Sequence, residues 1–191
     1  IAVQDHKLDI DAPLCDTIEV GNPAACEVTT RHLMEHASGF AWRETYEGTS
    51  PTASSVVGML YGGGQADMAR FVTSHELRDL PGTSYSYSSG NTVVQTAVAH
   101  SILRKHRGDE YLQEVLFGPL GITSAQFERD GSGVPIGSST LYLTPRDMAR
   151  YGAFLLQDGC WGGERLVPDG WMTRSTTPAA VLDGKLVHPP T

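Results

Sequence analysis

The sequence predicts a helix-rich α/β (α+β) domain with little sheet, and three observations support this prediction. The 191 residues contain 40% apolar and 19% charged residues, the composition of an ordinary globular chain that is long enough to bury a core. Apolar side chains recur with helical spacing in several segments, whereas strand-like runs are short and few. Frequent Gly and Pro residues separate these segments, so the individual elements should be short.

The composition also excludes several classes of protein. Lys and Arg number 14 against 22 Asp and Glu, a net charge of −8, and the basic residues are scattered. Nucleic-acid binding needs a clustered positive face, so no nucleic-acid partner is expected. No apolar run approaches the roughly 18 residues of a membrane span. The modest charge and adequate apolar content argue against disorder.

The first half of the chain is expected to hold loops and three short helices. Residues 9–27 form an extended or loop segment, because Pro and Gly-Asn-Pro turn signals interrupt them. Gly39 should end the first helix, and a polar loop over 40–53 should follow it. The helices are expected at Thr30–Ser38, Ser54–Tyr61 and Ala66–Ser74.

The longest helix is expected from about Gly90 to Lys105, after a turn at Pro81-Gly82. A short amphipathic helix should follow over residues 109–118. The apolar stripe of the long helix comprises Val94, Val98 and Ile102.

The clearest helix start lies at Thr144, which can cap the N-terminus while Pro145 occupies the first position and Asp147 faces the helix dipole. This helix should cover residues 145–157, and a further short helix should run from Pro168 to Trp171. The expected buried stripe of the first comprises Met148, Tyr151 and Leu155. Strand signals occur at Ser84–Tyr87, Ala125–Glu128 and Leu141–Leu143.

The three cysteines leave two interpretations open. Cys15 and Cys26 lie in one polar loop and are close enough in sequence to pair, which would indicate an oxidising compartment. Two unpaired thiols fit the sequence equally well, because sequence alone does not fix the geometry of a disulfide. Cys160 has no counterpart nearby.

A short motif raises the possibility of a metal site. His32, Glu35 and His36 match the H-x-x-E-H pattern, in which two histidines one helical turn apart bind zinc and the glutamate acts as a base. A third ligand would be needed, and nothing in the sequence marks one. The alternative is a short helix that holds two histidines without a metal.

A second candidate is the hydroxyl-rich segment over residues 85–92. Tyr87 lies there between a Pro-Gly turn and the long helix, where a helix N-terminus and a nearby cation would favour phenolate and let the tyrosine relay protons. The alternative interpretation is a polar turn that only caps the helix.

No activated serine can be identified in the chain. The G-x-S-x-G pattern is absent. Only Lys7, Lys105 and Lys185 could complete S-x-x-K, and none has a serine three residues earlier. The Gly62-Gly63-Gly64 triplet is not a phosphate loop, because no Lys-Ser or Lys-Thr follows it.

Five segments together resemble the serine β-lactamase-like family, which includes class C β-lactamases, penicillin-binding D,D-peptidases, esterases and 6-aminohexanoate-dimer hydrolase. They follow the family order and cover nearly the whole chain. The family patterns are T-I-R-H-L-L-T-H-T-S-G-L, P-G-x-x-F-x-Y-S-x-G-N, L-F-x-P-L-G-I, G-L-Y-L-T-P-R-D-M-A-R-F-G and G-x-W-x-G. The matching segments are residues 28–40, 81–91, 116–122, 141–152 and 159–163.

The resemblance implies roles for individual residues. Tyr87 falls on the catalytic tyrosine, and Ser89 falls where many members have Asn, so the Y-x-N form is not kept. Asn91 is a candidate for that polar role. Trp42 and Tyr46, with Glu44 between them, fall on a loop that borders the substrate pocket in the aminohexanoate branch. A histidine at position 36 is common in the family, which weakens the zinc hypothesis.

The resemblance further implies a β-lactamase/transpeptidase-like fold, represented mainly by its helical lobe with parts of the antiparallel sheet. The chain begins at Ile1 inside a family segment, so residues 1–191 are expected to be a partial domain, truncated at both ends. A processed or renumbered chain is the alternative. The S-x-x-K helix would precede residue 1, and the C-terminal sheet strands would follow residue 191.

The implied activity is hydrolysis of an ester, amide or β-lactam through an acyl-enzyme, with a small-molecule or peptide-like substrate and no metal or organic cofactor. The 191 residues alone are expected to be inactive, because they contain no S-x-x-K. A catalytically dead binding protein is the alternative, and a zinc peptidase is the remote one.

Overall fold

The computed structural model describes residues 1–4, 8–46, 53–177, 180–182 and 185–187. The chain divides into two compact units. Unit 1 comprises Ile1–Asp9, Ile102–Glu128 and Thr140–Pro178, and unit 2 comprises Ile10–Ser101, Arg129–Ser139 and Ala179–Thr191. Strands occur only as short antiparallel pairs within the described residues. No helix in this part of the chain has the length and apolar character needed to cross a membrane.

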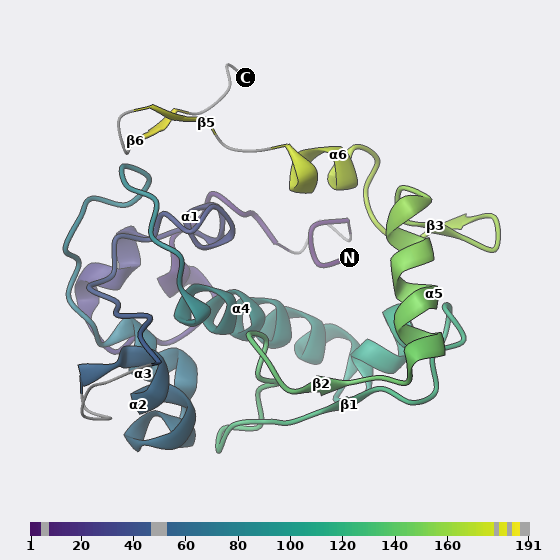
Figure 1. Ribbon diagram of the computed structural model, residues 1–191, viewed down its shortest axis with the longest axis horizontal. Helices are drawn as coiled ribbons and strands as arrows, with labels where there is room; N and C mark the ends of the chain where they lie inside the picture. Colours follow the sequence, from purple (N-terminus) through teal and green to yellow (C-terminus); the bar gives the residue numbers. More distant parts are fainter. Residues whose placement is uncertain (5–7, 47–52, 178–179, 183–184, 188–191) are drawn as a thin grey trace. The chain divides into compact units, whose positions relative to one another are not determined.

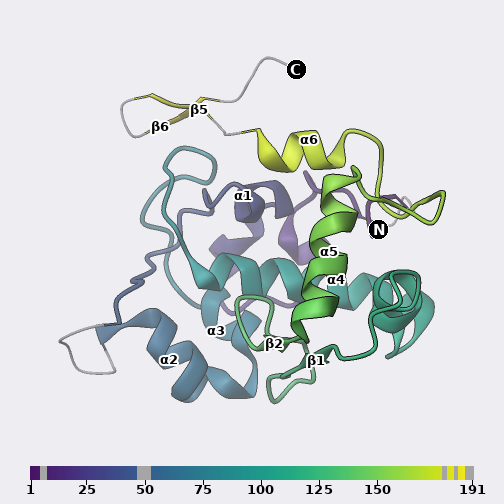
Figure 2. The same ribbon diagram turned by 45° about the vertical axis from the view of Figure 1, so that its right-hand side comes forward.

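Unit 2 consists of short helices and most of one long helix (Figure 1). Its 3₁₀ turns are η1 (Leu14–Asp16), η2 (Pro23–Glu27) and η4 (Gly63–Ala66). Its helices are α1 (Thr30–Met34), α2 (Ser55–Tyr61), α3 (Met68–Thr73) and the first turns of α4 (Ser89–Arg107), and its strands are β5 (Ala180–Leu182) and β6 (Lys185–Val187). Helices α2 and α3 lie side by side in both views (Figure 1 and Figure 2).

Local signals explain where these helices begin. The side chains of Thr29, Ser54 and Asp67 each accept a backbone N–H bond from the first turn of α1, α2 and α3. The predicted stripe of α4 is confirmed for Val94 and Val98, which are buried, whereas Ile102 is half-buried. The predictions of α2 and α4 are therefore confirmed. Of the loop predicted over 40–53, residues 47–52 lie outside the described part of the chain.

Helix α1 is shorter than the prediction of Thr30–Ser38. It ends at Met34, and His36 adopts a left-handed backbone conformation with φ of 52°. The main-chain oxygens of His36 and Ala37 then accept bonds from the N–H groups of Ser86 and Gly82, both at 2.8 Å. The helix itself is closed by a left-handed cap, in which the N–H groups of Ala37 and His36 bond to the main-chain oxygens of His32 at 2.8 Å and Leu33 at 3.1 Å. The backbone after Met34 then bonds to a distant segment.

The strand predicted at Ser84–Tyr87 is wrong. The N–H of Ser86 bonds to the main-chain oxygen of His36, but the N–H of Ser88 bonds to the His36 ring. A strand ladder needs main-chain acceptors from successive residues of a neighbouring strand. Here both acceptors belong to His36, so this segment forms no ladder.

Unit 1 contains most of the elements in the second half of the chain. These are the π-helical turn η5 (Gln113–Phe117), strands β1 (Gln126–Phe127), β2 (Leu141–Tyr142), β3 (Cys160–Trp161) and β4 (Glu164–Arg165), and helices α5 (Pro145–Leu156) and α6 (Trp171–Thr176). Gln126 pairs with Tyr142 in β1–β2, and Cys160 pairs with Arg165 in β3–β4. The core of the unit comprises Phe117, Leu120, Ile122, Phe154 and Val167.

Two helix predictions in unit 1 need correction. Helix α6 starts at Trp171 and not at Pro168, because residues 168–170 form a turn and Gly170 adopts φ of 72°. The predicted buried stripe of α5 is confirmed only for Tyr151, which packs against the core, because Met148 is 51% exposed and Leu155 38% exposed while Phe154 is only 2% exposed. The face that carries Asp147, Tyr151 and Phe154 is therefore turned inward.

Asp147 explains the orientation of α5. Its carboxylate accepts bonds from the N–H groups of Thr123 and Ser124 and from the Ser124 hydroxyl, and it pairs with Arg150 at 2.6 Å. This buried anchor fixes one face of the first turn against the 123–124 loop. The apolar pattern of the helix, which favoured Met148 and Leu155 as well as Tyr151, carries no information about this polar contact.

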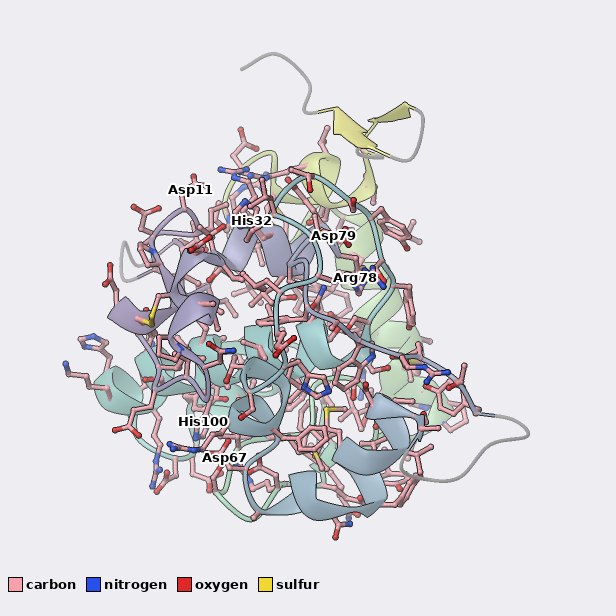
Figure 3. All side chains as sticks on the ribbon, turned by 90° about the vertical axis from the view of Figure 1, so that its left-hand side faces the viewer. Asp11, His32, Asp67, Arg78, Asp79 and His100 are labelled. Carbon is pink, nitrogen blue, oxygen red and sulfur yellow. A yellow bond between two sulfur atoms is a disulfide. The ribbon has the colours of Figure 1, made fainter. Side chains whose placement is uncertain are left out.

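The disulfide left open by the sequence is formed in the structure. Cys15 and Cys26 are bonded and join η1 to η2 in unit 2, while Cys160 is a free thiol (Figure 3 draws disulfide bonds in yellow).

Reduction of this disulfide should destabilise the protein. The bond closes a loop between residues 11 positions apart, so its loss should lower the free energy of unfolding by about 3 kcal/mol through the entropy of the unfolded chain. Chemical denaturation of a Cys15→Ser/Cys26→Ser variant would measure this. The control is Cys160→Ser, and an equal effect of both changes would contradict the prediction.

Asp147 should make unit 1 sensitive to acid. The hydrogen bond from the Ser124 hydroxyl is the main reason why the pKa of Asp147 is lowered from 3.8 to about 2. Desolvation opposes this shift, while bonds from the Ser124 N–H, Arg150 and the Thr123 N–H add to it. The folded pKa lies below the unfolded value, so this stabilisation is complete above pH 4 and is lost as the pH falls towards 2. Thermal melts between pH 2 and 7 should show a flatter acid limb in Asp147→Asn. Asp169→Asn, which changes an exposed carboxylate, should leave that limb unchanged.

Candidate active site

The candidate site gathers around the N-terminus of α4, within unit 2. Ser88 caps this helix: its buried hydroxyl accepts a bond from the N–H of Asn91 at 3.1 Å. Tyr87 precedes the cap and is 59% exposed, so its phenol reaches solvent while its backbone is tied to the helix start. The sequence order of turn, tyrosine, serine cap and helix therefore places one exposed phenol at a helix N-terminus.

Glu44 is the centre of the hydrogen-bond network at this helix start. Its Oε2 accepts bonds from the Trp42 indole N–H and from the backbone N–H of Ser89, the latter at 3.1 Å. Its Oε1 accepts bonds from the Ser89 hydroxyl at 2.5 Å and the Tyr46 hydroxyl at 2.8 Å. A carboxylate has about four acceptor positions, so this network uses all of them.

The electrostatic balance keeps Glu44 ionised. Partial burial raises the pKa of its carboxyl, but hydrogen bonds from the Ser89 side chain, Trp42, Tyr46 and the Ser89 backbone outweigh that effect, and the net pKa is lowered. The same contacts act in the opposite sense on the phenol of Tyr46. Burial and the hydrogen bond to Glu44 raise the pKa of Tyr46, so it remains a neutral donor.

A glycine lets Trp42 pack beneath the helix. Trp42 is only 5% exposed. A Cβ built on Gly90 would lie 3.0 Å from two carbons of the indole ring, so a larger residue there would push the ring away. Trp42, predicted as a pocket residue, is therefore a buried support of the helix start.

Asn91 is also placed inside the unit. It is 1% exposed, and its Oδ1 accepts a bond from the buried hydroxyl of Ser38 at 2.7 Å. Its Nδ2 is buried with no hydrogen-bond partner among the described residues. Of the five residues predicted from the sequence, Tyr87 and Tyr46 are exposed, Ser89 is half-buried, and Trp42 and Asn91 are buried.

His36 lies against Tyr87. The ring centroids are 4.9 Å apart with an interplanar angle of 32°, and the ring of Tyr85 lies 6.0 Å from the His36 ring on an edge-to-face approach. The Nδ1 of His36 accepts the N–H of Ser88 at 3.3 Å. Burial lowers the pKa of His36, and the charge of Glu44 offsets only part of this effect. His36 is therefore neutral at pH 7, with its proton on Nε2.

The predicted zinc pattern is not arranged as a metal site. Helix α1 ends before His36, so the two histidines do not share a helical face. The Nδ1 of His32 accepts the N–H of Thr29 at 3.2 Å, and the His32 ring lies near Asp11 (Figure 3). No group of three or more metal-binding side chains occurs among the residues that the structure describes.

The sequence interpretation missed Glu44 and His36 as organising residues. A weak signal for Glu44 was present, because Trp42, Glu44 and Tyr46 alternate along an extended chain and so project to the same side. No local signal marks His36, since its partners lie some fifty residues away.

Comparison with known proteins gives a consistent result. The Beta-lactamase family model matches residues 1–187. A solved structure from Bacillus anthracis, classed as a 6-aminohexanoate-dimer hydrolase, is 19% identical with a TM-score of 0.72 and is matched over 91% of this chain and 47% of its own. The penicillin-binding protein of Bacillus halodurans is 18% identical with a TM-score of 0.66, over 93% and 60%.

A D-stereospecific amidohydrolase from a Streptomyces species is 19% identical with a TM-score of 0.60, over 92% of this chain and 60% of its own. The chain thus spans about half the length of the solved structures that it matches, and at these identities the likeness concerns the fold. That fold is β-lactamase/transpeptidase-like, present in part and mostly helical with small sheets. Because the family model covers nearly all of its residues, the chain belongs to the beta-lactamase family.

Proposed function

We propose that this chain supplies the tyrosine side of an acyl-enzyme active site in a serine hydrolase that acts on an ester, amide or β-lactam. The nucleophilic serine and its lysine would come from an S-x-x-K segment upstream of residue 1. The observation that carries the proposal is the exposed phenol of Tyr87 at the N-terminus of α4. The resemblance of residues 81–91 to the family motif supports it, because that resemblance implies that Tyr87 is the catalytic tyrosine.

In this proposal Tyr87 relays a proton. The serine attacks the substrate carbonyl, and its proton passes through the lysine and the Tyr87 hydroxyl to the leaving group. Backbone N–H groups stabilise the oxyanion, and water then releases the acyl group.

Glu44 does not serve as the general base. All four of its acceptor positions are used by Trp42, Tyr46 and Ser89, so no lone pair remains for a substrate or water proton. Its role is to hold the loop that carries Tyr46 against the first residue of α4. Tyr46 then borders the substrate pocket beside Tyr87, with Ser89 between them and with Trp42 and Asn91 supporting the site from within.

A catalytically dead binding protein is the second candidate. A complete gene without S-x-x-K would favour it. The two candidates differ in a single feature of the complete gene, since the hydrolase requires a Ser-x-x-Lys helix and the binding protein does not.

Replacing Glu44 by Gln should destabilise the helix start. The amide NH₂ group would face donors that now bond to a carboxylate, so we expect the free energy of unfolding to fall by about 2 kcal/mol at pH 7. Because the folded pKa of Glu44 lies below its ordinary value of 4.5, this difference should shrink as the pH falls from 4.5 through the lowered folded pKa. The measurement is chemical denaturation at pH 7 and pH 3.5.

Glu114→Gln is the matched control for this variant, because Glu114 forms one exposed ion pair with Arg107. Such a pair contributes about 0–1 kcal/mol. A loss in Glu44→Gln no larger than that in Glu114→Gln would contradict the anchoring role of Glu44.

Replacing Tyr87 by Phe should abolish most of the hydrolysis. In the protein encoded by the complete reading frame, kcat for a p-nitrophenyl ester or a chromogenic β-lactam should fall by about 10²–10⁴-fold, because the proton relay is lost. The 191 residues alone should show no turnover. Tyr61→Phe, which changes an exposed tyrosine at the end of α2, should keep the wild-type rate. Ester turnover by the 191-residue chain, lost on Tyr87→Phe, would refute an upstream nucleophile.

A further inference from the structure

We propose that His36 is the positioning residue of Tyr87, and that it holds the phenol in place only while its imidazole is neutral. This inference rests on the proposed function in one respect, which is that Tyr87 is the proton relay. It adds a residue outside the helix and outside the tyrosine motif, from a segment some fifty positions earlier in the chain.

The first support is that His36 makes three separate contacts with three consecutive residues. Its main-chain oxygen accepts the N–H of Ser86 at 2.8 Å, and its Nδ1 accepts the N–H of Ser88 at 3.3 Å. Between these two bonds, its ring packs on the ring of Tyr87 with a centroid separation of 4.9 Å. The backbone on both sides of Tyr87 and the phenol ring itself are thus held by one residue.

The second support is the backbone of His36. A φ of 52° is unfavourable for a residue with a side chain, and it occurs two residues after the end of α1. This conformation turns the ring out of the helical path and towards the start of α4. The same residue closes α1 as a Schellman cap, because the N–H groups of Ala37 and His36 bond to the main-chain oxygens of His32 at 2.8 Å and Leu33 at 3.1 Å. The cap of α1 and the placement of the ring beside residues 86–88 therefore use one backbone conformation.

The third support is the direction of the hydrogen bond at Nδ1. Because a backbone N–H donates to this nitrogen, the ring must be deprotonated there. Protonation would point an N–H at the N–H of Ser88, which breaks the bond and places a positive charge on that side of the tyrosine segment. The His36–Tyr87 arrangement is therefore stable only with a neutral ring.

The surroundings set the pH at which this happens. The titratable groups that act on the ring are the carboxylate of Glu44, from the 40–46 loop, and the phenols of Tyr85 and Tyr87, from the segment before α4. Burial lowers the pKa of His36 below 6.5 and the nearby charge of Glu44 raises it in part. Positioning of Tyr87 should therefore be complete at neutral pH and be lost on the acid side.

Two substitutions distinguish the role of the His36 Nδ1 acceptor from the need for a residue that tolerates positive φ. His36→Asn places Oδ1 where Nδ1 lies, accepts the Ser88 N–H without titrating, and tolerates positive φ. His36→Gly also tolerates positive φ but removes both the acceptor and the ring. His106→Asn is the control, because His106 is exposed near the end of α4.

The test uses the protein encoded by the complete reading frame, with kcat for p-nitrophenyl acetate measured between pH 4.5 and 8.5. We expect the wild type and His106→Asn to lose at least tenfold in kcat as the pH falls through the pKa of His36, which NMR of the imidazole ring gives independently. His36→Asn should lack this acid limb and stay within about fivefold of wild type at pH 8. His36→Gly should lose about 100-fold at every pH, because the phenol is no longer oriented.

A second readout does not depend on turnover. In the wild type, the Ser88 amide and the Tyr87 ring signals should shift with the pKa of His36, and in His36→Asn they should not. If no ester is hydrolysed, the proposed function fails while these NMR shifts still decide the role of His36. The inference is overturned if His36→Asn keeps the acid limb, if His36→Gly keeps the wild-type rate, or if the Ser88 and Tyr87 signals ignore the His36 titration.

Discussion

The free N–H groups at the start of α4 are the constraint on which the candidate site depends. A helix N-terminus must find acceptors for these groups from outside the helix. Here Ser88 takes the N–H of Asn91, while Glu44 takes the N–H of Ser89. The N–H of Ser88 itself bonds to His36. Three acceptors from different parts of the chain thus meet at one point, and the exposed Tyr87 is held between them.

Elements with strong local signals could be predicted from the sequence, and elements whose ends depend on distant partners could not. Helix α2, helix α4 and the start of α5 follow from caps, turn residues and apolar periodicity, which act within a few residues. The early end of α1 comes from a left-handed cap at His36, a residue that does not mark a helix end as glycine does, and the capped backbone also bonds to Ser86 and Gly82. The inward face of α5 depends on a buried polar anchor, Asp147, that apolar periodicity does not report.

The same distinction applies to the site. The place of Tyr87 beside a helix start could be predicted from the sequence because the tyrosine, the serine cap and the helix are contiguous, whereas its catalytic role comes from the family resemblance and stays a prediction. The burial of Trp42 and Asn91 could not be found, since it comes from packing against Gly90 and from the bond with Ser38. Polar and aromatic residue types therefore indicated the right neighbourhood, but only the three-dimensional contacts separate the residues that face solvent from those that support them.

The glutamate at the helix start changes what its neighbour can offer to a ligand. Many family members have Asn at the position of Ser89, and an amide provides both donors and an acceptor. The hydroxyl of Ser89 has a single proton, and it gives that proton to the ionised carboxylate of Glu44. A ligand can therefore bond to the Ser89 hydroxyl oxygen only by donating a proton to it. The Glu44–Ser89 pair therefore makes this edge of the site an acceptor surface, while Tyr46 and Tyr87 supply the hydroxyl groups beside it.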